Sequence, residues 1–313
     1  MVSMSGKCAK FTANLRRTVY ASDDLLETAV ACLLARGHLL IEGFPGIGKT
    51  VLARSLARSI GAEFRRMQFT NDLMPADVLG TSVYDRNEST FSFKQGPIFA
   101  NVFLADEINR ANPKTQSALL EAMQECRVSV DAGTFELPRP FFVLATENPI
   151  EFEGTYPLPE AQIDRFLVRL RMDYPNAEEE KRLYAHGSTE PHIDTLEPVL
   201  SCDEVRELQD AVEKVTIEDS LVEYVHQVVR RTREHPDVEL GVSPRGALLW
   251  ICAAKAFALM AGNTYVVPDD LKRSAVPALA HRLTVLAARD TADISAAQDQ
   301  VVRKVLESVE VPR

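Results

Sequence analysis

Short apolar runs recur through the first half of the chain, and several of them end in polar or small residues. This pattern is typical of buried parallel strands whose carboxyl ends reach the surface. We expect strands at residues 38–41, 64–69, 102–107, 141–146 and 167–172. In the last run apolar residues alternate with Arg169 and Arg171, which favours a strand at the edge of the sheet.

Helical periodicity lies between these runs. Residues 51–60 carry apolar side chains at helical spacing before Gly61, and Asn112-Pro113 is typical of a helix start. Two further segments alternate around polar turns, so residues 81–93 and 128–137 are hairpin candidates. A surface loop remains an equal alternative for residues 81–93.

Every pattern after residue 173 is helical, with apolar stripes that repeat every three or four residues. Strands that alternate with helices, followed by helices alone, indicate an α/β domain and a helical bundle. We expect the first domain at 1–172 and the second at 173–313.

The composition of the chain argues against several classes of protein. The 313 residues carry a formal net charge of −10, which argues against a dedicated nucleic-acid binder. Five scattered cysteines without metal-ligand spacing suit free thiols in a reducing cytoplasm. No leader pattern and no apolar run near 18 residues occurs, so we expect neither secretion nor a membrane span.

One loop between the first strand and its helix fits the phosphate-binding pattern G-x-x-x-x-G-K-[ST]. Its glycines allow backbone N–H groups to approach phosphate oxygens, Lys49 would neutralise phosphate charge, and Thr50 would ligate Mg²⁺. The following helix points its positive end at the same anion. The expected nucleotide-binding residues are Gly43, Pro45, Gly46, Ile47, Gly48, Lys49, Thr50 and Val51.

Two later strands deliver polar side chains at their carboxyl ends. Asp106 is placed to hold Mg²⁺, and Glu107 is placed to polarise a water for attack on the γ-phosphate. Asn148 follows the next apolar strand, and its amide suits a group that reads the γ-phosphate and the attacking water.

The chain resembles the MoxR family of AAA+ ATPases from about residue 22 to residue 283. The stretches that carry the resemblance are 43–50, 104–111, 144–149, 157–166 and 243–245. The resemblance implies a P-loop NTPase fold with a parallel five-stranded sheet in the order 5-1-4-3-2, followed by an all-helical lid. It also implies ATP and Mg²⁺ as ligands. Residues 1–12 lie outside the family pattern, which is typical of a disordered terminus.

Two arginines acquire roles from the resemblance alone. Arg165 matches the arginine finger that enters a neighbouring subunit's site, and Arg245 matches the sensor-2 position at which the lid touches the γ-phosphate. A homo-oligomeric ring follows, and a hexamer is the family expectation. Relatives usually carry Gly-Gln near the adenine, where this chain has Tyr20-Ala21-Ser22, so the base contact stays open.

The expected function is therefore ATP hydrolysis coupled to chaperone-like remodelling of a protein partner, often one with a von Willebrand factor A domain. The two hairpin candidates correspond to segments that face the pore or the top of the ring in relatives. A non-hydrolytic nucleotide-dependent scaffold and a chelatase-type motor subunit are alternatives. An MCM-like helicase is disfavoured by the acidic chain.

Overall fold

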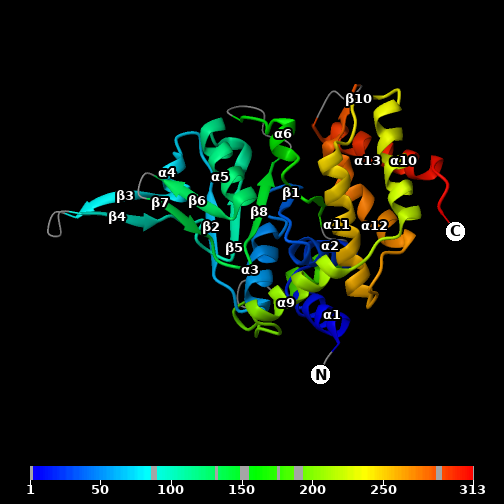
Figure 1. Ribbon diagram of the computed structural model, residues 1–313. Helices are drawn as coiled ribbons and strands as arrows, with labels where there is room; N and C mark the ends of the chain where they lie inside the picture. Colours follow the sequence, from blue (N-terminus) through cyan, green and yellow to red (C-terminus); the bar gives the residue numbers. More distant parts are fainter. Residues whose placement is uncertain are drawn as a thin grey trace.

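A parallel sheet forms the centre of the molecule (Figure 1). The computed structural model describes residues 3–85, 90–130, 133–148, 155–174, 177–186, 193–286 and 291–312. The strands of the sheet are β1 (Leu39–Gly43), β2 (Phe64–Gln68), β5 (Val102–Asp106), β8 (Phe142–Glu147) and β9 (Val168–Met172). They lie in the order β2-β5-β8-β1-β9, which confirms the expected order 5-1-4-3-2.

The two faces of the sheet bury alternate residues of the same strands, as a pleated backbone requires. Ile41 and Leu104 pack on one face in a core that includes Leu52 of α3 (Lys49–Ser59). Leu40 and Phe103 pack on the other face, in a core that includes residues of α5 (Pro113–Glu125). The strands therefore meet helices on both sides, and their carboxyl ends share one edge.

The chain begins with two helices, α1 (Met4–Leu15) and α2 (Asp23–Leu34). The side chain of Ser22 accepts a hydrogen bond from the backbone N–H of Leu25 at 3.3 Å and so caps the start of α2. The expectation of disorder is wrong for residues 4–12, because α1 begins at Met4 and buries Cys8 and Phe11 in the core. Residues 1 and 2 lie outside the described residues.

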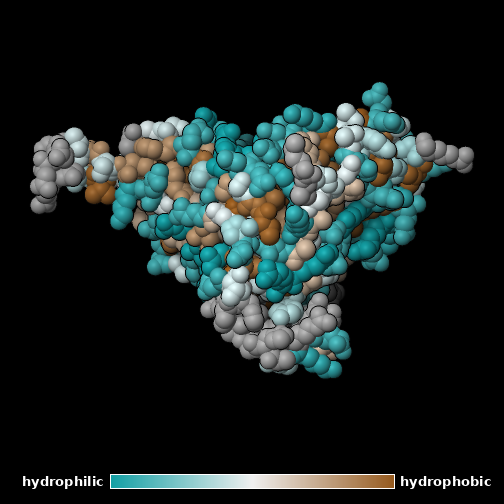
Figure 2. Space-filling view, turned by 90° about the horizontal axis from the view of Figure 1, so that it is seen from below, coloured by the Kyte–Doolittle hydropathy of each residue, from teal (hydrophilic) through white to brown (hydrophobic). Residues whose placement is uncertain are grey.

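Both hairpin predictions are confirmed. The first consists of β3 (Gly80–Asp85) and β4 (Thr90–Gln95), and the second of β6 (Arg127–Val130) and β7 (Gly133–Glu136). A short helix, α4 (Pro75–Leu79), leads into the first hairpin, which projects as an arm from the body (Figure 1). Tyr84 and Phe91 contact each other there with ring centroids 5.1 Å apart, and both are exposed. Brown, apolar atoms mark this arm in Figure 2.

The second half of the chain contains α7 (Ala177–His186), α9 (Cys202–Lys214), α10 (Asp219–Glu234), α11 (Pro244–Ala261), α12 (Pro268–Leu279), a 3-10 turn η2 (Ala280–Arg282) and α13 (Thr291–Ser308). The prediction of helices alone missed a small antiparallel pair, β10 (Val238–Leu240) with β11 (Thr284–Val285). These strands are too short to show a period of two in the sequence.

Helix α11 of the lid is unusually apolar for its length. Within the described residues, α11 alone is long and apolar enough to cross a membrane. Trp250 of α11 is fully buried, and its indole N–H donates to the Leu271 carbonyl of α12 at 2.9 Å. The helix thus packs as a core helix of the lid.

Arg169 departs from the expected alternation on β9, because its side chain is buried rather than solvated. It pairs with Glu42 of β1 at 3.2 Å and with Asp299 of α13 at 3.1 Å. The edge strand is therefore covered by the last helix, a long-range contact that local periodicity does not reveal.

Candidate nucleotide-binding site

The loop after β1 has the backbone that phosphate binding needs. Gly46 and Gly48 have φ angles of +83° and +95°, and a Cβ built at either would meet nothing within 4 Å. Only glycine adopts these angles without strain, and the space beside the loop stays open. Gly48 is the N-cap of α3, so the first N–H groups of that helix border the same space.

Lys49 brings a positive charge into this space. Its ammonium donates to the Gly43 carbonyl at 2.8 Å, and the side chain is largely buried. Burial lowers the pKa of Lys49, while the nearby charges of Asp106 and Glu107 raise it. The contact holds the lysine beside the loop, where phosphate oxygens would replace the carbonyl.

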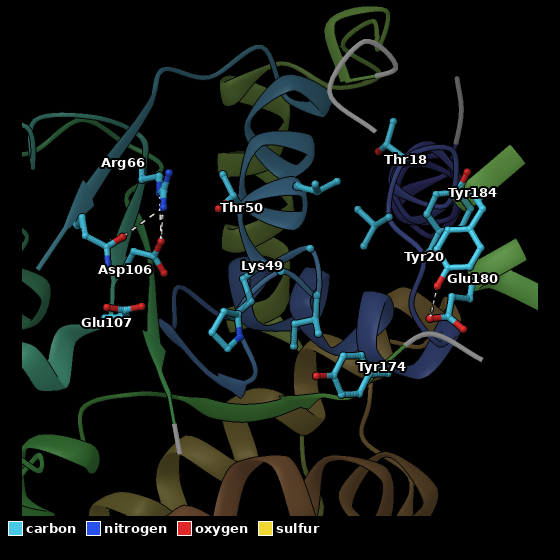
Figure 3. Close-up of a pocket in the computed structure, with 17 residues that line it drawn as sticks. Thr18, Tyr20, Lys49, Thr50, Arg66, Asp106, Glu107, Tyr174, Glu180 and Tyr184 are labelled. Atoms are coloured by element: carbon cyan, nitrogen blue, oxygen red, sulfur yellow. Dashed lines mark hydrogen bonds and ion pairs between the residues drawn. The ribbon is translucent and has the colours of Figure 1, made fainter. Parts of the chain in front are cut away.

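Asp106 stands at the end of β5, and each of its carboxylate oxygens has a partner. Oδ1 accepts a hydrogen bond from the Thr146 hydroxyl at 2.6 Å. Oδ2 accepts from the guanidinium of Arg66 at 2.7 and 3.1 Å (Figure 3). The carboxylate is thereby fixed by a strand on either side of it.

Glu107 follows at once in the left-handed region, with a φ of 55° that non-glycine residues rarely adopt. Its backbone N–H donates to the Thr146 hydroxyl at 2.8 Å, and its carboxylate accepts from Arg110 at 2.9 Å. One hydroxyl on β8 therefore contacts both the Asp106 carboxylate at the end of β5 and the backbone of Glu107 directly after it.

Sequence reasoning missed Arg66 and Thr146. Both lie on the strands that flank β5, and register pairs Gln68 with Asp106 and Ala145 with Ala105. Once the strand order is assumed, this register brings Thr146 beside Asp106. A charged residue in a strand next to an acidic strand end was the available signal for Arg66.

These groups line a cavity of ≈ 570 Å³, a size typical of small-molecule sites. Its walls are Thr18, Val19, Tyr20, Pro45, Gly46, Ile47, Gly48, Lys49, Thr50, Val51, Arg66, Gln68, Asp106, Glu107, Tyr174, Glu180 and Tyr184. Figure 3 shows Asp106 and Glu107 on one side, and the tyrosines together with Glu180 on the other. The cavity thus has one end rich in charge and one end rich in aromatic rings.

The tyrosines at one end of the cavity could contact the base of a nucleotide, for which the sequence predicted no residue. Tyr20 lines the cavity where relatives are expected to carry Gly-Gln, whereas Ser22 serves as the cap of α2. The Tyr184 hydroxyl donates to Glu180 at 2.7 Å, and Tyr174 stacks on Phe44 with centroids 5.4 Å apart. Flat rings at this end suit a planar base.

Four of the predicted site residues do not line this cavity. Gly43 ends β1, and its carbonyl accepts the hydrogen bond from Lys49. Asn148 is buried directly after β8, Arg165 follows α6 (Glu160–Ile163), and Arg245 is exposed in the first turn of α11. Among the described residues, no atom accepts a hydrogen bond from the buried Nε of Arg165. The two arginines come from neighbouring turns, because the Ser243 hydroxyl before Arg245 lies 3.4 Å from the Asp164 carboxylate before Arg165.

Glu147, next to Asn148, has an unusual environment that allows a pH prediction. Burial and the charge of Glu42, its register partner on β1, together raise the pKa of Glu147 to about 7, while Arg169 opposes them. The folded state therefore keeps a proton between pH 4.5 and about 7 that the unfolded chain releases, so stability falls as pH rises through this window. We expect Glu147→Gln to be more stable than the parent protein at pH 8, by at most about 3 kcal/mol, and similar at pH 4.5.

Urea unfolding of both proteins at several pH values tests this expectation. The parent should lose stability between pH 5 and pH 7.5 relative to the variant. Parallel pH curves for the two proteins would contradict the raised pKa. Glu121→Gln, on the exposed face of α5, is the matched control.

Comparison with protein families gives two matches along the chain. Residues 38–168 match the model of the ATPase family associated with various cellular activities (AAA). Residues 230–305 match the model of the AAA lid domain. The first match spans strands β1, β2, β5 and β8 together with Asp106 and Glu107, and the second spans most of the helices after residue 230.

Similar proteins cover nearly the whole chain. An uncharacterised protein, YeaC, from Bacillus subtilis is 47% identical, over 97% of this chain and 94% of that protein. Chaperone MoxR1 of Mycobacterium tuberculosis is 42% identical, over 96% of this chain and 81% of that protein. Protein MoxR of Methylorubrum extorquens is 28% identical, over 97% and 95%.

A solved structure has the same fold. The crystal structure of a putative ATPase from Cytophaga hutchinsonii superposes with a TM-score of 0.86 at 33% sequence identity. It covers 99% of this chain and 96% of that chain.

Proposed function

Because the chain belongs to the MoxR family of AAA+ ATPases, we propose that it hydrolyses ATP in a ring of identical subunits and uses this energy to remodel, assemble or activate a partner protein. One observation carries the proposal. Lys49, Asp106 and Glu107 meet in one cavity, and the Thr146 hydroxyl contacts both the Asp106 carboxylate and the backbone N–H of Glu107. A lysine for phosphate and two fixed carboxylates are the groups that phosphoryl transfer to water requires.

The residues fit a magnesium ion at this site. The Thr50 hydroxyl and the Asp106 carboxylate are hard oxygen donors on the same cavity, and Arg66 already places a cation against Asp106. Mg²⁺, when bound, would neutralise charge on the β- and γ-phosphates. Among the described residues no group of three His, Cys, Asp or Glu could hold a metal, as expected where phosphates supply much of the coordination.

The chain's own residues perform distinct tasks in the proposed reaction. The N–H groups at Gly46 and Gly48 and the Lys49 ammonium would bind the phosphates. Glu107 would accept a hydrogen bond from water and orient it toward the γ-phosphate, once its contact with Arg110 is exchanged. Asn148 would donate to the γ-phosphate from the adjacent strand end.

The position of two arginines supports the proposed ring. Arg165 and Arg245 carry positive charge outside the cavity of their own chain, on neighbouring turns. We propose that both complete the cavity of the next subunit in a head-to-tail hexamer, which is a contact that closes into a ring. There they would stabilise the charge of the transition state.

The partner proposal rests on family evidence. The name of the relative Chaperone MoxR1 supports action on other proteins, and the family resemblance suggests a partner with a von Willebrand factor A domain. The exposed Tyr84 and Phe91 on the hairpin arm offer apolar contact for it. Free thiols such as Cys8 and Cys32 suit a cytoplasmic location, which is part of the proposal.

A second candidate is a scaffold that binds ATP and does not hydrolyse it at a useful rate. It is favoured by the ion pairs that engage both acids, Arg66 with Asp106 and Arg110 with Glu107. Steady-state phosphate release by the assembled ring separates the two. Turnover that stays at the rate of uncatalysed hydrolysis, with and without partner, would select the scaffold.

Lys49→Ala tests nucleotide binding. We expect ATP affinity in the presence of Mg²⁺ to fall on the order of a hundredfold, because a charge-assisted contact in a largely buried position is lost. Isothermal titration with a slowly hydrolysed ATP analogue measures the change. Lys114→Ala, an exposed lysine at the start of α5, should bind like the parent protein. Equal affinity for the Lys49 variant would refute the assignment of the cavity.

A further inference from the structure

Arg282, at the end of η2, is a buried arginine that holds the turn around Arg165. Its side chain is only 2% exposed. Nε donates to the Asp164 carboxylate at 2.8 Å, and Nη2 donates to the Phe166 carbonyl at 2.6 Å. Weaker contacts reach the carbonyls of Asp164 at 3.3 Å and Leu167 at 3.4 Å. One guanidinium thus binds the backbone on both sides of Arg165.

The stem of the same side chain lies against the helix that carries Arg245. A Cβ placed at Gly246 would be 2.7 Å from Arg282 Cδ, so only glycine permits this approach. Ser243 caps α11 through the Gly246 N–H at 3.0 Å and also lies 3.4 Å from the Asp164 carboxylate. The turns of Arg165 and Arg245 are therefore joined at a single packed point.

Charge and geometry make this joint specific for arginine. Burial lowers the pKa of Arg282 to about 10, with Asp164 opposing the change, so the group stays charged at neutral pH. The contacts with Asp164, Phe166 and Leu167 use Nε, Nη2 and Nη1 in turn, so they engage all three nitrogens of the guanidinium fork. A lysine could keep the charge but not this set of contacts.

We propose that Arg282 is a positioning residue for ATP hydrolysis: it fixes Arg165 in the orientation that reaches the neighbouring cavity and couples it to Arg245. Arg282 does not line the cavity of its own chain, so it acts through the turn that it holds. The inference rests on the proposed ring, in which these two arginines act on the next subunit. It adds a residue that the motifs of the sequence do not indicate.

The test uses Arg282→Lys and Arg282→Gln in the full chain. Both variants keep an intact cavity, so affinity for an ATP analogue should match the parent protein. Turnover should fall at least tenfold, because a displaced Arg165 stabilises the charge of the transition state less well. Arg273→Gln is the matched control: this lid arginine of α12 pairs with Asp24 and Glu27 on α2 and touches neither turn.

Rings assembled from two different variants distinguish a positioning role of Arg282 from a general loss of stability in its variants. A Glu107→Gln subunit has a defective cavity and an intact Arg165, so it can serve an Arg282 variant as its neighbour. In an equal mixture about a quarter of the interfaces pair a sound cavity with a sound arginine, and activity should rise from near zero to about a quarter of the parent value. A destabilised subunit would gain nothing from this mixing.

Arg165→Ala, mixed in the same way, distinguishes the two proposals. Recovery with Arg165→Ala but not with either Arg282 variant overturns the positioning role. Absence of recovery in every mixture overturns the shared ring site itself. Parent-like turnover of Arg282→Lys would show that the charge suffices, and would also overturn the inference. If Arg282→Gln fails to fold, the lysine variant alone decides.

Discussion

Glu107→Gln is expected to bind ATP and Mg²⁺ like the parent protein and to hydrolyse ATP at least about a hundredfold more slowly. The amide keeps the size of the side chain but cannot accept a proton or orient water as a carboxylate does. The backbone N–H of Glu107 donates to the Thr146 hydroxyl at 2.8 Å, so the substitution should leave the backbone at this position unchanged. Phosphate release at saturating ATP, together with analogue binding, measures both halves of the expectation.

The control is Glu121→Gln on the exposed face of α5, which makes the same chemical change far from the cavity. Turnover of the Glu107 variant within a factor of two of the parent would show that Glu107 has no role in hydrolysis.

The Glu107→Gln variant can also be used to identify the partner protein. Held in its ATP state, it should retain a partner protein that Lys49→Ala releases, and mass spectrometry of the retained protein would identify that partner.

Arg165→Ala is expected to lower turnover by a factor on the order of 10³ to 10⁵ without weakening ATP binding. Arg165 lies outside the cavity of its own chain, so each subunit keeps a complete phosphate loop. What is lost is the positive charge that would reach the next subunit as the transition state forms. Steady-state hydrolysis and analogue titration at the same ring concentration measure the two quantities.

Arg171→Ala, an exposed arginine on β9, is the matched control and should leave turnover unchanged. A second control is concentration: turnover per subunit of the parent should rise with protein concentration as rings assemble. Constant turnover from a dilute monomer to a concentrated sample would contradict a site completed by a neighbour. So would a loss of ATP affinity in the Arg165 variant that equals its loss of turnover.

The sequence predicted those parts of the site that local patterns define. The glycines before Lys49 predict the phosphate-binding loop, and the apolar strand before Asp106 predicts an acid at its end. Each of these signals lies within a few consecutive residues. The convergence of these segments follows from the parallel sheet, because carboxyl ends of strands share one edge. The order of the strands came from the family resemblance and not from periodicity.

The parts that sequence reasoning missed depend on contacts between distant segments. Thr146 and Arg66 matter only because their strands flank β5, and Arg282 matters only because η2 packs on the turn of Arg165. Nothing in the local spacing of these residues distinguishes them from ordinary strand or helix positions. The order of residues 4–12 was missed for a similar reason, since it depends on burial of Phe11 against the rest of the core.

The shared core has a mechanical consequence for the hairpin arm. Ile41 and Leu104 of the sheet belong to the same apolar cluster as Trp250 and Leu271 of the lid, so the subunit resists bending between these two parts. In the proposed ring, motion would then arise as each subunit tilts as a rigid body at its boundaries. The β3–β4 hairpin acts as a lever in such a tilt, because displacement grows with distance from the pivot. Tyr84 and Phe91, far out on this arm, would sweep the longest path for a given angle.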